Sequence, residues 1–300
     1  MIYSLSMEMY ENEELPATLE WYKDQIAGHH PSVVKNGIRQ IGIVKERGKE
    51  QNLLKLVQDG MRGISEVQFY DSIFQKDQSN HTKAQAVALE GLRNFVPHYF
   101  GKRVIEIASR SYEFIELEDI THQYRKPCIM DIKIGKVTYD PDASEDKKHT
   151  ESIKCPHQKE FGFRILGYRL HPDERGQIRV RDKNWGRTRT PENIQIAFDE
   201  YFQAIPSKKL KSDAIKVFRK ELAKISEWFD TQQEIQMYSS SLLFVYEGDP
   251  HYHTPAKMKM IDFSHVFYEK QYDENYIHGL KFIDNVFQCI EKTDINKEKF

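Results

Sequence analysis

The stretch PCIMDIKIG, from Pro127 to Gly135, constrains the fold of this chain more than any other segment. Alternate side chains of an extended strand point to opposite faces. One face of such a strand would hold only apolar side chains, those of Cys128, Met130, Ile132 and Ile134. The other face would carry Asp131 and Lys133 next to Ile129. An acid and a base side by side are unfavourable core residues but suit phosphate chemistry, so we expect a core strand whose second face opens onto a functional site.

The composition is that of an ordinary globular protein. The 300 residues suffice for one domain or two lobes, and 44 Lys+Arg stand against 46 Asp+Glu, which is not the balance of a general polyanion binder. Cys128, Cys155 and Cys289 lack metal-ligand spacing and predict reduced thiols. No apolar run reaches membrane-spanning length, and the polar stretch from Met1 to Glu20 does not predict a signal peptide. We expect a soluble monomer of the nucleus and cytoplasm.

The hydrophobic pattern predicts a mixed α+β protein with two unequal lobes. Residues 1–24 are acidic and weakly periodic, and we expect a flexible lead-in. Residues 25–120 should form a small lobe around an antiparallel sheet. Its expected elements are a hairpin over Ile38–Val57, a helix after Gly63 that buries Ile64, Val67, Tyr70 and Phe74, a short helix and turn over Leu92–Phe100, and strands over Val104–Ile107 and Tyr112–Leu117.

Residues 121–300 should form the larger lobe. The polar, lysine-bearing segment Asp140–Gln158 has too few apolar residues for a core element. Thr190, Pro191 and Glu192 predict a helix start, because a hydroxyl caps the helix, proline suits its first position and an acid suits its first turn. The other expected elements are strands over Phe161–Leu170, Ser241–Tyr246 and Lys257–Phe263, and helices that bury one face of Ile215–Phe229 and of Tyr276–Ile290.

Three further residues have the chemistry that phosphoryl transfer from ATP requires, namely a cation for the phosphates and a carboxylate for Mg²⁺. Lys55 lies in mid-strand between leucines, and Glu66 lies on the following helix; kinases hold ATP phosphates with such a pair. Taken alone, the two would more often be a solvated lysine and a surface glutamate. Asp262 ends an apolar strand and precedes Phe263, where kinase-like folds place a magnesium carboxylate.

The spacing P-x-x-x-D-x-K-x-G from Pro127 to Gly135 is similar to the signature of the inositol polyphosphate kinase family. Two other segments resemble elements of that family in type and order: Leu117–Thr121 (LEDIT) precedes the motif and Ser240–Leu243 (SSLL) follows it. The chain is therefore identified as a member of the family, similar to its multikinase branch over nearly the whole length. The resemblance implies a protein-kinase-like fold with a short inositol-binding insertion at about residues 140–160.

The resemblance also implies roles for single residues. ATP contacts are implied for Lys55, Glu66, Glu118, Ile120, Asp131, Leu243 and Asp262. Asp131, Lys133 and Asp262 are the implied catalytic residues, and Asp262 and Ser241 the implied Mg²⁺ ligands. Asp131 would either bind a ribose hydroxyl or orient the acceptor hydroxyl. Contacts to the inositol phosphate are implied for Lys133, Lys147, Lys154, Lys183 and His265. Other cations of the same region are Lys136, Lys148, Lys159 and Arg164.

The implied reaction is ATP-dependent phosphorylation of inositol trisphosphate and tetrakisphosphate at the 3- and 6-hydroxyls, toward the pentakisphosphate. His149, Thr150 and Glu151 stand where the animal multikinases have a glutamine run, and Lys183 is shared with hexakisphosphate kinases. A pyrophosphate-forming hexakisphosphate kinase is therefore the alternative. A phosphoinositide lipid headgroup is a further class of acceptor.

Functions other than that of a kinase have less support from the sequence. A non-catalytic scaffold that binds inositol phosphates is the main rival, and the intact Lys55, Asp131, Lys133 and Asp262 argue against it. A metal site at His251 and His253 lacks further ligands at suitable spacing. The lysines of residues 208–224 lack the interleaved aromatic residues or recognised motif of a nucleic-acid binder.

Overall fold

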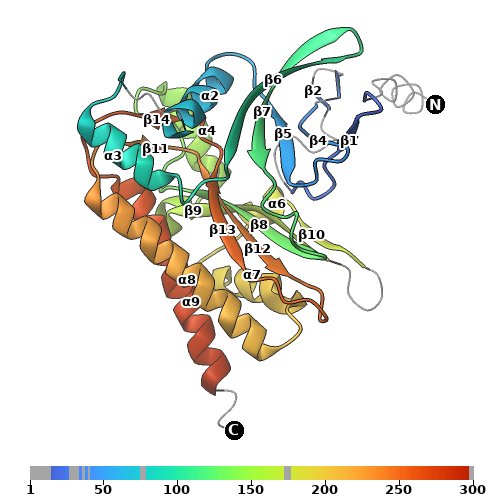
Figure 1. Ribbon diagram of the computed structural model, residues 1–300. Coiled ribbons are helices and arrows are strands. Elements are labelled where there is room, and N and C mark those ends of the chain that lie inside the picture. Colours follow the sequence, from blue (N-terminus) through green and yellow to red (C-terminus); the bar gives the residue numbers. More distant parts are fainter. Residues whose placement is uncertain are drawn as a thin grey trace, which may run out of the picture.

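The computed structural model describes residues 15–26, 34–35, 38–39, 41–74, 79–171 and 177–296. Two antiparallel sheets of five strands each form its frame, and helices pack around them (Figure 1). The α+β architecture with two unequal lobes is the one expected from the sequence. Among these described residues, no helix combines the length and the apolar character needed to cross a membrane.

The N-terminal sheet is antiparallel throughout. In spatial order its strands are β1 (Leu19–Trp21), β4 (Ile43–Glu46), β5 (Asn52–Leu56), β7 (Arg110–Glu118) and β6 (Tyr99–Ile107). Strands β4 and β5 form the hairpin that the sequence predicts, with Ile43 opposite Lys55. A separate pair of two-residue strands, β2 (Val34–Lys35) and β3 (Ile38–Arg39), lies before β4 in the chain.

The flexible lead-in expected over residues 1–24 is wrong for its second part. Residues 1–14 lie outside the described residues. Leu19–Trp21 instead form β1, which pairs with β4 at the edge of the sheet. Leu19 is only 4% exposed and joins a small core with Val44 and Phe114. A three-residue strand is too short for a periodic pattern, so Leu19 and Trp21 were the available signals.

Helix α2 (Met61–Phe74) follows β5 and buries Val67 and Tyr70 as expected, but Ile64 is exposed. Its buried face also carries Glu66. Helix α3 (Lys83–Leu92) was missed, although Thr82 and Gln85 form a capping box at its start, which is a sequence signal for a helix. The short helix expected over Leu92–Phe100 is instead a turn that leads into β6.

The C-terminal sheet has the predicted core strand at its centre. Its order is β10 (Arg179–Arg181), β9 (Phe163–Leu170), β8 (Pro127–Ile134), β12 (Ser241–Glu247) and β13 (Lys257–Ile261). The four alternate side chains of β8 expected on one face all join the main hydrophobic core: Cys128, Met130, Ile132 and Ile134. The core-strand prediction is confirmed.

Long helices cover the core face of this sheet. Helix α8 (Lys208–Thr231) and helix α9 (Glu274–Asn296) lie side by side in Figure 1, and α7 (Ile194–Tyr201) with the short η1 (Phe202–Ala204) packs near them. Helix α8 buries Ile215, Phe218, Leu222, Ile225 and Phe229, as its pattern predicts. The start predicted at Thr190 is too early, because residues 190–193 form a turn and Asn193 is the N-cap of α7.

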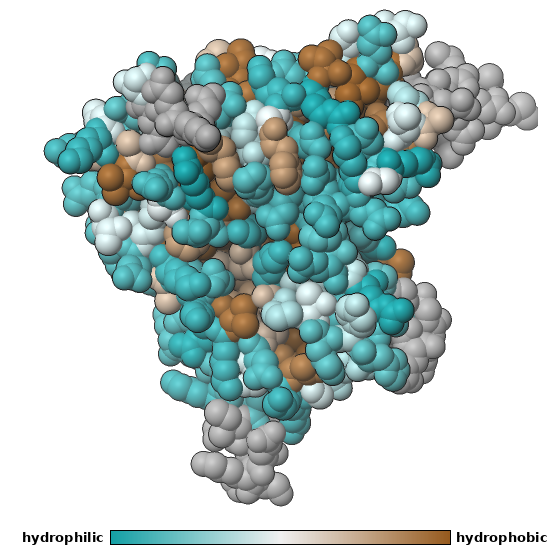
Figure 2. Space-filling view, in the orientation of Figure 1, coloured by the Kyte–Doolittle hydropathy of each residue, from teal (hydrophilic) through white to brown (hydrophobic). Residues whose placement is uncertain are grey.

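The remaining elements are short helices and a separate two-stranded sheet. Helix α4 (Glu145–Lys154) buries none of its residues, in agreement with the polar pattern of the predicted insertion. Helices α5 (Gln158–Phe161) and α6 (Lys183–Arg187) pack against β9, and β11 (Gln236–Met237) pairs with β14 (Val266–Phe267). Hydrophilic residues cover most of the face shown in Figure 2.

Candidate active site

Two cavities of different character meet between the sheets. The first, of about 280 Å³, is lined by apolar side chains from both sheets, among them Ile43, Leu53, Leu117, Ile120 and Leu243. The second, of about 200 Å³, is lined almost entirely by polar and charged side chains. Gln58, Lys133 and Asp262 line both. A molecule in the apolar cavity and one in the polar cavity would therefore meet at these three side chains.

Strand β8 delivers Asp131 and Lys133 to this meeting point. Both side chains leave β8 on the face opposite the core and line the apolar cavity. On β9, a bulge opposite β8 leaves one extra residue, Leu166, because Asp131 pairs with Gly167 while Ile132 pairs with Ile165. Leu166 lines the same cavity. The prediction that the acid and the base share one face of the strand is confirmed.

Lys55 joins the N-terminal sheet to the end of β13. Its Nζ lies 2.6 Å from Oε1 of Glu66 and 2.6 Å from Oδ1 of Asp262. Burial lowers the pKa of Lys55, but the charges of Asp262 and Glu66 outweigh burial and raise it, so the lysine is charged. The strand lysine and helix glutamate predicted as a pair are thus in contact, together with the carboxylate predicted to hold a metal.

The backbone of Asp262 has an unusual conformation. Its φ is +65°, in the left-handed region that residues other than glycine seldom adopt. Such a conformation costs on the order of 1 kcal/mol and persists where neighbouring contacts hold it. The contact with Lys55 is one such contact, and the turn directs the carboxylate back toward the cavities rather than onward along β13.

Asp131 is a buried carboxylate with an unsatisfied oxygen. The residue is 7% exposed, and its Oδ1 accepts no hydrogen bond from the described residues. Burial, with a contribution from the charge of Asp262, raises the pKa of Asp131 to about 7. Two neighbouring carboxylates that repel each other in one cavity are suited to a hard divalent cation such as Mg²⁺. Asp131 and Asp262 are the residues that would hold it.

The described residues contain no cluster of three or more His, Cys, Asp or Glu placed to bind a metal. Mg²⁺ usually takes one or two carboxylates from the protein and completes its shell with water and substrate phosphates, so two carboxylates fit this ion. Ser241, the second ligand that the resemblance implied, is fully buried and lines neither cavity. Its role as a ligand stays a prediction.

The loop between β7 and β8 forms one wall of the apolar cavity. Glu118 and Ile120, the implied hinge residues, both line it. The Glu118 carboxylate accepts a hydrogen bond from the backbone N–H of His98 at 3.2 Å and lies 3.3 Å from Nζ of Lys257. Burial raises the pKa of Glu118, but these partners outweigh burial and lower it. Glu118 is therefore ionised and held in place.

Asp119 was not predicted as a site residue, yet it fixes this loop. It is 1% exposed, lies 2.7 Å from Nζ of Lys45, and accepts hydrogen bonds from the backbone and hydroxyl of Thr121. Tyr22 of the loop after β1 donates to the same carboxylate at 3.4 Å. The signal was the spacing Asp-x-Thr, which is typical of a side chain that caps its own turn.

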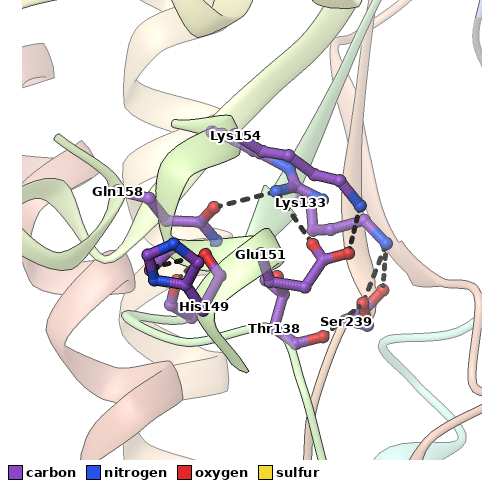
Figure 3. A network of polar contacts seen from close by, with 10 residues as sticks. Lys133, Thr138, His149, Glu151, Lys154, Gln158 and Ser239 are labelled. Atoms are coloured by element: carbon purple, nitrogen blue, oxygen red, sulfur yellow. Dashed lines mark hydrogen bonds and ion pairs between the residues drawn. The ribbon is translucent and has the colours of Figure 1, made fainter. Parts of the chain in front are cut away.

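The polar cavity collects most of the cations assigned to the acceptor. Lys133, Lys147 and His265 line it, as predicted. Nζ of Lys133 donates to the carbonyl and the hydroxyl of Ser239 at 3.1 and 3.0 Å (Figure 3). Lys147 and His265 both contact Asp140, at 3.1 and 2.6 Å. Burial is the main reason that the pKa values of Lys133 and His265 are lowered.

Two predicted acceptor residues are placed differently. Lys154 does not line the cavity itself but contacts Glu151, which does. Lys183 is exposed at the first residue of α6 and lines neither cavity. Its assignment to the acceptor stays a prediction.

Several lining residues of the polar cavity were not predicted as contacts. Gln58 lies in the loop between β5 and α2, and Arg62 is the second residue of α2. Both stand between Lys55 and Glu66 in the chain, and that position was the available signal. Thr138 and Ser239 come from loops beside β8 and β12, which only the folded sheet brings together. Arg164 of β9, one of the cations named for this region, also lines the cavity.

The two-lobed α+β architecture and the Lys55, Glu66 and Asp262 cluster define the kinase-like class of folds. The model of the family "Inositol polyphosphate kinase" matches residues 114–288. The inositol polyphosphate multikinase of Mus musculus is 35% identical over 238 residues, which cover 79% of this chain and 55% of the mouse protein. The inositol hexakisphosphate kinase 3 of Mus musculus is 26% identical over 208 residues, with 61% and 52% covered.

A solved structure is also similar. The crystal structure of the inositol phosphate multikinase Ipk2 from S. cerevisiae, in complex with ADP and Mn²⁺, has a TM-score of 0.64 and 27% identity, covering 80% of this chain and 99% of that chain. The chain belongs to the inositol polyphosphate kinase family. It spans about half the length of the mammalian multikinases, 55% of the mouse and 50% of the human protein.

Proposed function

We propose that this chain transfers the γ-phosphoryl group of ATP to a ring hydroxyl of a soluble inositol polyphosphate. The observation that carries the proposal is the pair of cavities that meet at Lys133 and Asp262. The apolar cavity has the lining and the loop of residues 118–120 that an adenine base requires, whereas the polar cavity carries the cations that a polyanionic acceptor requires. The family membership agrees with both assignments.

The residues at the junction have distinct tasks. Lys55, charged and fixed by Glu66, would bind the α- and β-phosphates of the nucleotide. Asp262 and Asp131 would hold Mg²⁺, which supplies charge neutralisation on the phosphates when bound. Lys133 would stabilise the negative charge of the transferring phosphoryl group, since it faces both cavities.

The reaction balances with the groups present. The acceptor hydroxyl oxygen forms a bond to the γ-phosphorus, the bond from that phosphorus to the bridging oxygen breaks, and ADP leaves with the electron pair. The hydroxyl proton must leave the acceptor. That proton passes to water, and Asp131 either orients the acceptor hydroxyl or binds a ribose hydroxyl of the nucleotide. In Asp131→Asn, loss of kcat at an unchanged KM for ATP supports the first role, and a raised KM for ATP supports the second.

The proposed acceptors are inositol trisphosphate and tetrakisphosphate, phosphorylated at the 3- and 6-hydroxyls. The mouse multikinase supports this choice, because it is 35% identical to this chain whereas the mouse hexakisphosphate kinase 3 is 26% identical. The alternative is a pyrophosphate-forming hexakisphosphate kinase, which the resemblance at Lys183 favours. Incubation with Mg-ATP and a panel of inositol phosphates, with positional assignment of products by NMR, separates the two. A phosphoinositide headgroup in vesicles belongs in the same panel.

A non-catalytic scaffold would bind inositol phosphates without consuming ATP. Release of ADP that depends on the added acceptor excludes the scaffold, whereas binding with no ADP release in the presence of Mg²⁺ contradicts the proposed function. We also propose a monomer that resides in the nucleus and cytoplasm, consistent with free Cys128, Cys155 and Cys289. Light scattering and a fluorescent fusion test these two points.

A further inference from the structure

Glu151 places a negative charge inside a cavity that is otherwise built for anions. It lies on α4 and lines the polar cavity with the cations Lys133, Lys147 and Arg164. Figure 3 shows its carboxylate between the end of Lys154 and the region where Lys133 contacts Ser239. A carboxylate at this position is unfavourable for an acceptor covered in phosphates, so its presence needs an explanation.

Two cations hold the Glu151 carboxylate in place. Oε1 accepts from Nζ of Lys154, and Oε2 lies 3.5 Å from Nη1 of Arg164. Arg164 is 9% exposed and also donates to Oε1 of Gln158 at 3.2 Å, and Gln158 in turn donates to the carbonyl of Gly135 at 3.0 Å. The position of Glu151 is thus tied to the sheet through a chain of contacts that ends at the motif strand β8.

The carboxylate remains ionised and has free acceptor capacity. Burial raises the pKa of Glu151, but Lys154 and Arg164 outweigh burial and lower it. The Glu151 side chain is 17% exposed, so it is open to the cavity rather than enclosed. An ionised carboxylate has about four lone-pair sites, and the two cations occupy only some of them. Glu151 can therefore accept a hydrogen bond from a hydroxyl group of a ligand.

The charge balance around Glu151 also limits what can bind beside it. Glu151, Lys154 and Arg164 together carry one positive charge, because the carboxylate neutralises one of the two cations. A phosphate group placed against Glu151 would meet a like charge in a partly desolvated cavity, where the repulsion is stronger than in water. A ring hydroxyl at the same place would instead donate a hydrogen bond to a charged acceptor, which is a strong interaction.

We propose that Glu151 determines acceptor specificity: it selects an inositol phosphate that presents a free hydroxyl, rather than a phosphate, to the side of the cavity between Lys154 and Arg164. This inference rests on the proposed function of the same site. With Glu151 in this place, a cavity with several cations would discriminate against fully phosphorylated rings. Ring positions that face Lys133, Lys147 and Arg62 keep the cations that bind phosphate groups.

The test compares Glu151→Gln with Glu145→Gln as the matched control. Glu145 lies on the same helix and pairs with Lys148 at 2.9 Å, but its side chain is 89% exposed and does not line the cavity. Both changes remove one negative charge from α4. Binding of inositol trisphosphate and inositol hexakisphosphate is measured by calorimetry at one fixed ionic strength, because salt screens such interactions. Turnover with Mg-ATP is measured for the same two compounds.

Glu151→Gln should strengthen binding of the hexakisphosphate relative to the trisphosphate, which changes the ratio of the two dissociation constants by at least about tenfold. Glu145→Gln should change that ratio by less than about twofold. Glu151→Asp keeps the charge and should keep most of the wild-type discrimination. A thermal unfolding curve for each variant establishes that it is folded. If Glu151→Gln is unfolded, Glu151→Asp is the variant that tests the inference. Loss of its discrimination between the trisphosphate and the hexakisphosphate, despite the retained charge, overturns the inference.

The outcomes separate this inference from the proposed function. Suppose that the wild type phosphorylates the trisphosphate, but the ratio of the two dissociation constants is unchanged in Glu151→Gln or changes equally in Glu145→Gln. This result overturns the role of Glu151 and leaves the kinase function in place. A wild type that binds both compounds without consuming ATP contradicts the kinase function, and the ratio still decides the role of Glu151. A wild type that binds and phosphorylates neither compound overturns both.

Discussion

The buried contact of Lys55 with Glu66 allows a stability prediction that is independent of any activity assay. In Lys55→Met, a side chain of similar length replaces the lysine, and Glu66 loses the cation at 2.6 Å. The Glu66 side chain is 2% exposed, so water cannot replace the lysine. Breaking a buried ion pair in this way costs about 3–5 kcal/mol, because an uncompensated charge remains buried. We expect the free energy of unfolding to fall by that amount at pH 8.

The loss should depend on pH in a defined direction. Burial raises the pKa of Glu66 above its ordinary value even in the wild type, and removal of Lys55 raises it further. A carboxyl group whose pKa is higher in the folded than in the unfolded protein destabilises the fold increasingly as the pH rises through that range. Protonation of Glu66 as the pH falls removes the uncompensated charge, so the deficit of Lys55→Met should be smaller at pH 5 than at pH 8.

Urea unfolding followed by the fluorescence of the three tryptophans measures these values. Lys102→Met is the control, because the pair of Lys102 and Glu113 has the same chemistry at 3.0 Å but side chains that are 50% and 43% exposed. It should lose less than about 1 kcal/mol. The double variant Lys55→Met with Glu66→Leu should recover most of the stability, since apolar replacement of a buried pair is often neutral, but not the activity. A loss equal to that of the control would refute the assignment of a buried pair.

Three further predictions concern single positions. Lys133→Ala and Asp262→Asn should each lower kcat by at least about 10²-fold in the ADP-release assay, because each removes a charge at the junction of the cavities. Circular dichroism should show that both variants are folded. Turnover close to wild type in either variant contradicts the role of that residue. In metal-free protein, Asp131→Asn should be more stable than wild type by about 2–4 kcal/mol at pH 8, because the pKa of about 7 makes the ionised wild-type carboxylate unfavourable. This difference in stability should arise between about pH 4 and pH 7. Equal urea unfolding curves of the two proteins at pH 8 would contradict the prediction. Gly279→Ala on α9 should lose about 1–3 kcal/mol, although alanine favours helices, because its Cβ would lie 2.2 Å from the carbonyl oxygen of Gly162; a gain in Tm would contradict the packing of α9.

The sequence predicted best where a single strand carries the information. Period-two alternation placed Asp131 and Lys133 on one face of β8, and the folded sheet keeps that arrangement. Lys55 and Glu66 were predicted to meet because kinases pair a strand lysine with a glutamate of the following helix, and the two are in contact. The helices α8 and α9 were predicted from their apolar stripes, which long helices display over several turns.

The sequence predicted least where contacts join distant segments. The left-handed turn at Asp262 has no glycine to indicate it. The carboxylate of Glu151 lies on a helix with no buried residue, and its position in the cavity beside Arg164 of β9 depends on the folded sheet. In the sequence Asp119 is one of several acids in a loop, and only the fold brings it into contact with Lys45 on β4. Such positions depend on tertiary packing that local patterns do not encode.

The central claim is that one apolar and one cationic cavity bring a nucleotide and an inositol phosphate together at Lys133 and Asp262. The most direct measurement is a crystal structure of the ternary complex with Mg²⁺, a non-hydrolysable ATP analogue and inositol trisphosphate. In that complex we expect the adenine against Ile120 and Leu243, and an acceptor hydroxyl oxygen about 3–3.5 Å from the γ-phosphorus beside Lys133. An inositol ring bound away from the polar cavity, or a nucleotide whose γ-phosphate lies away from Asp262, would contradict the claim.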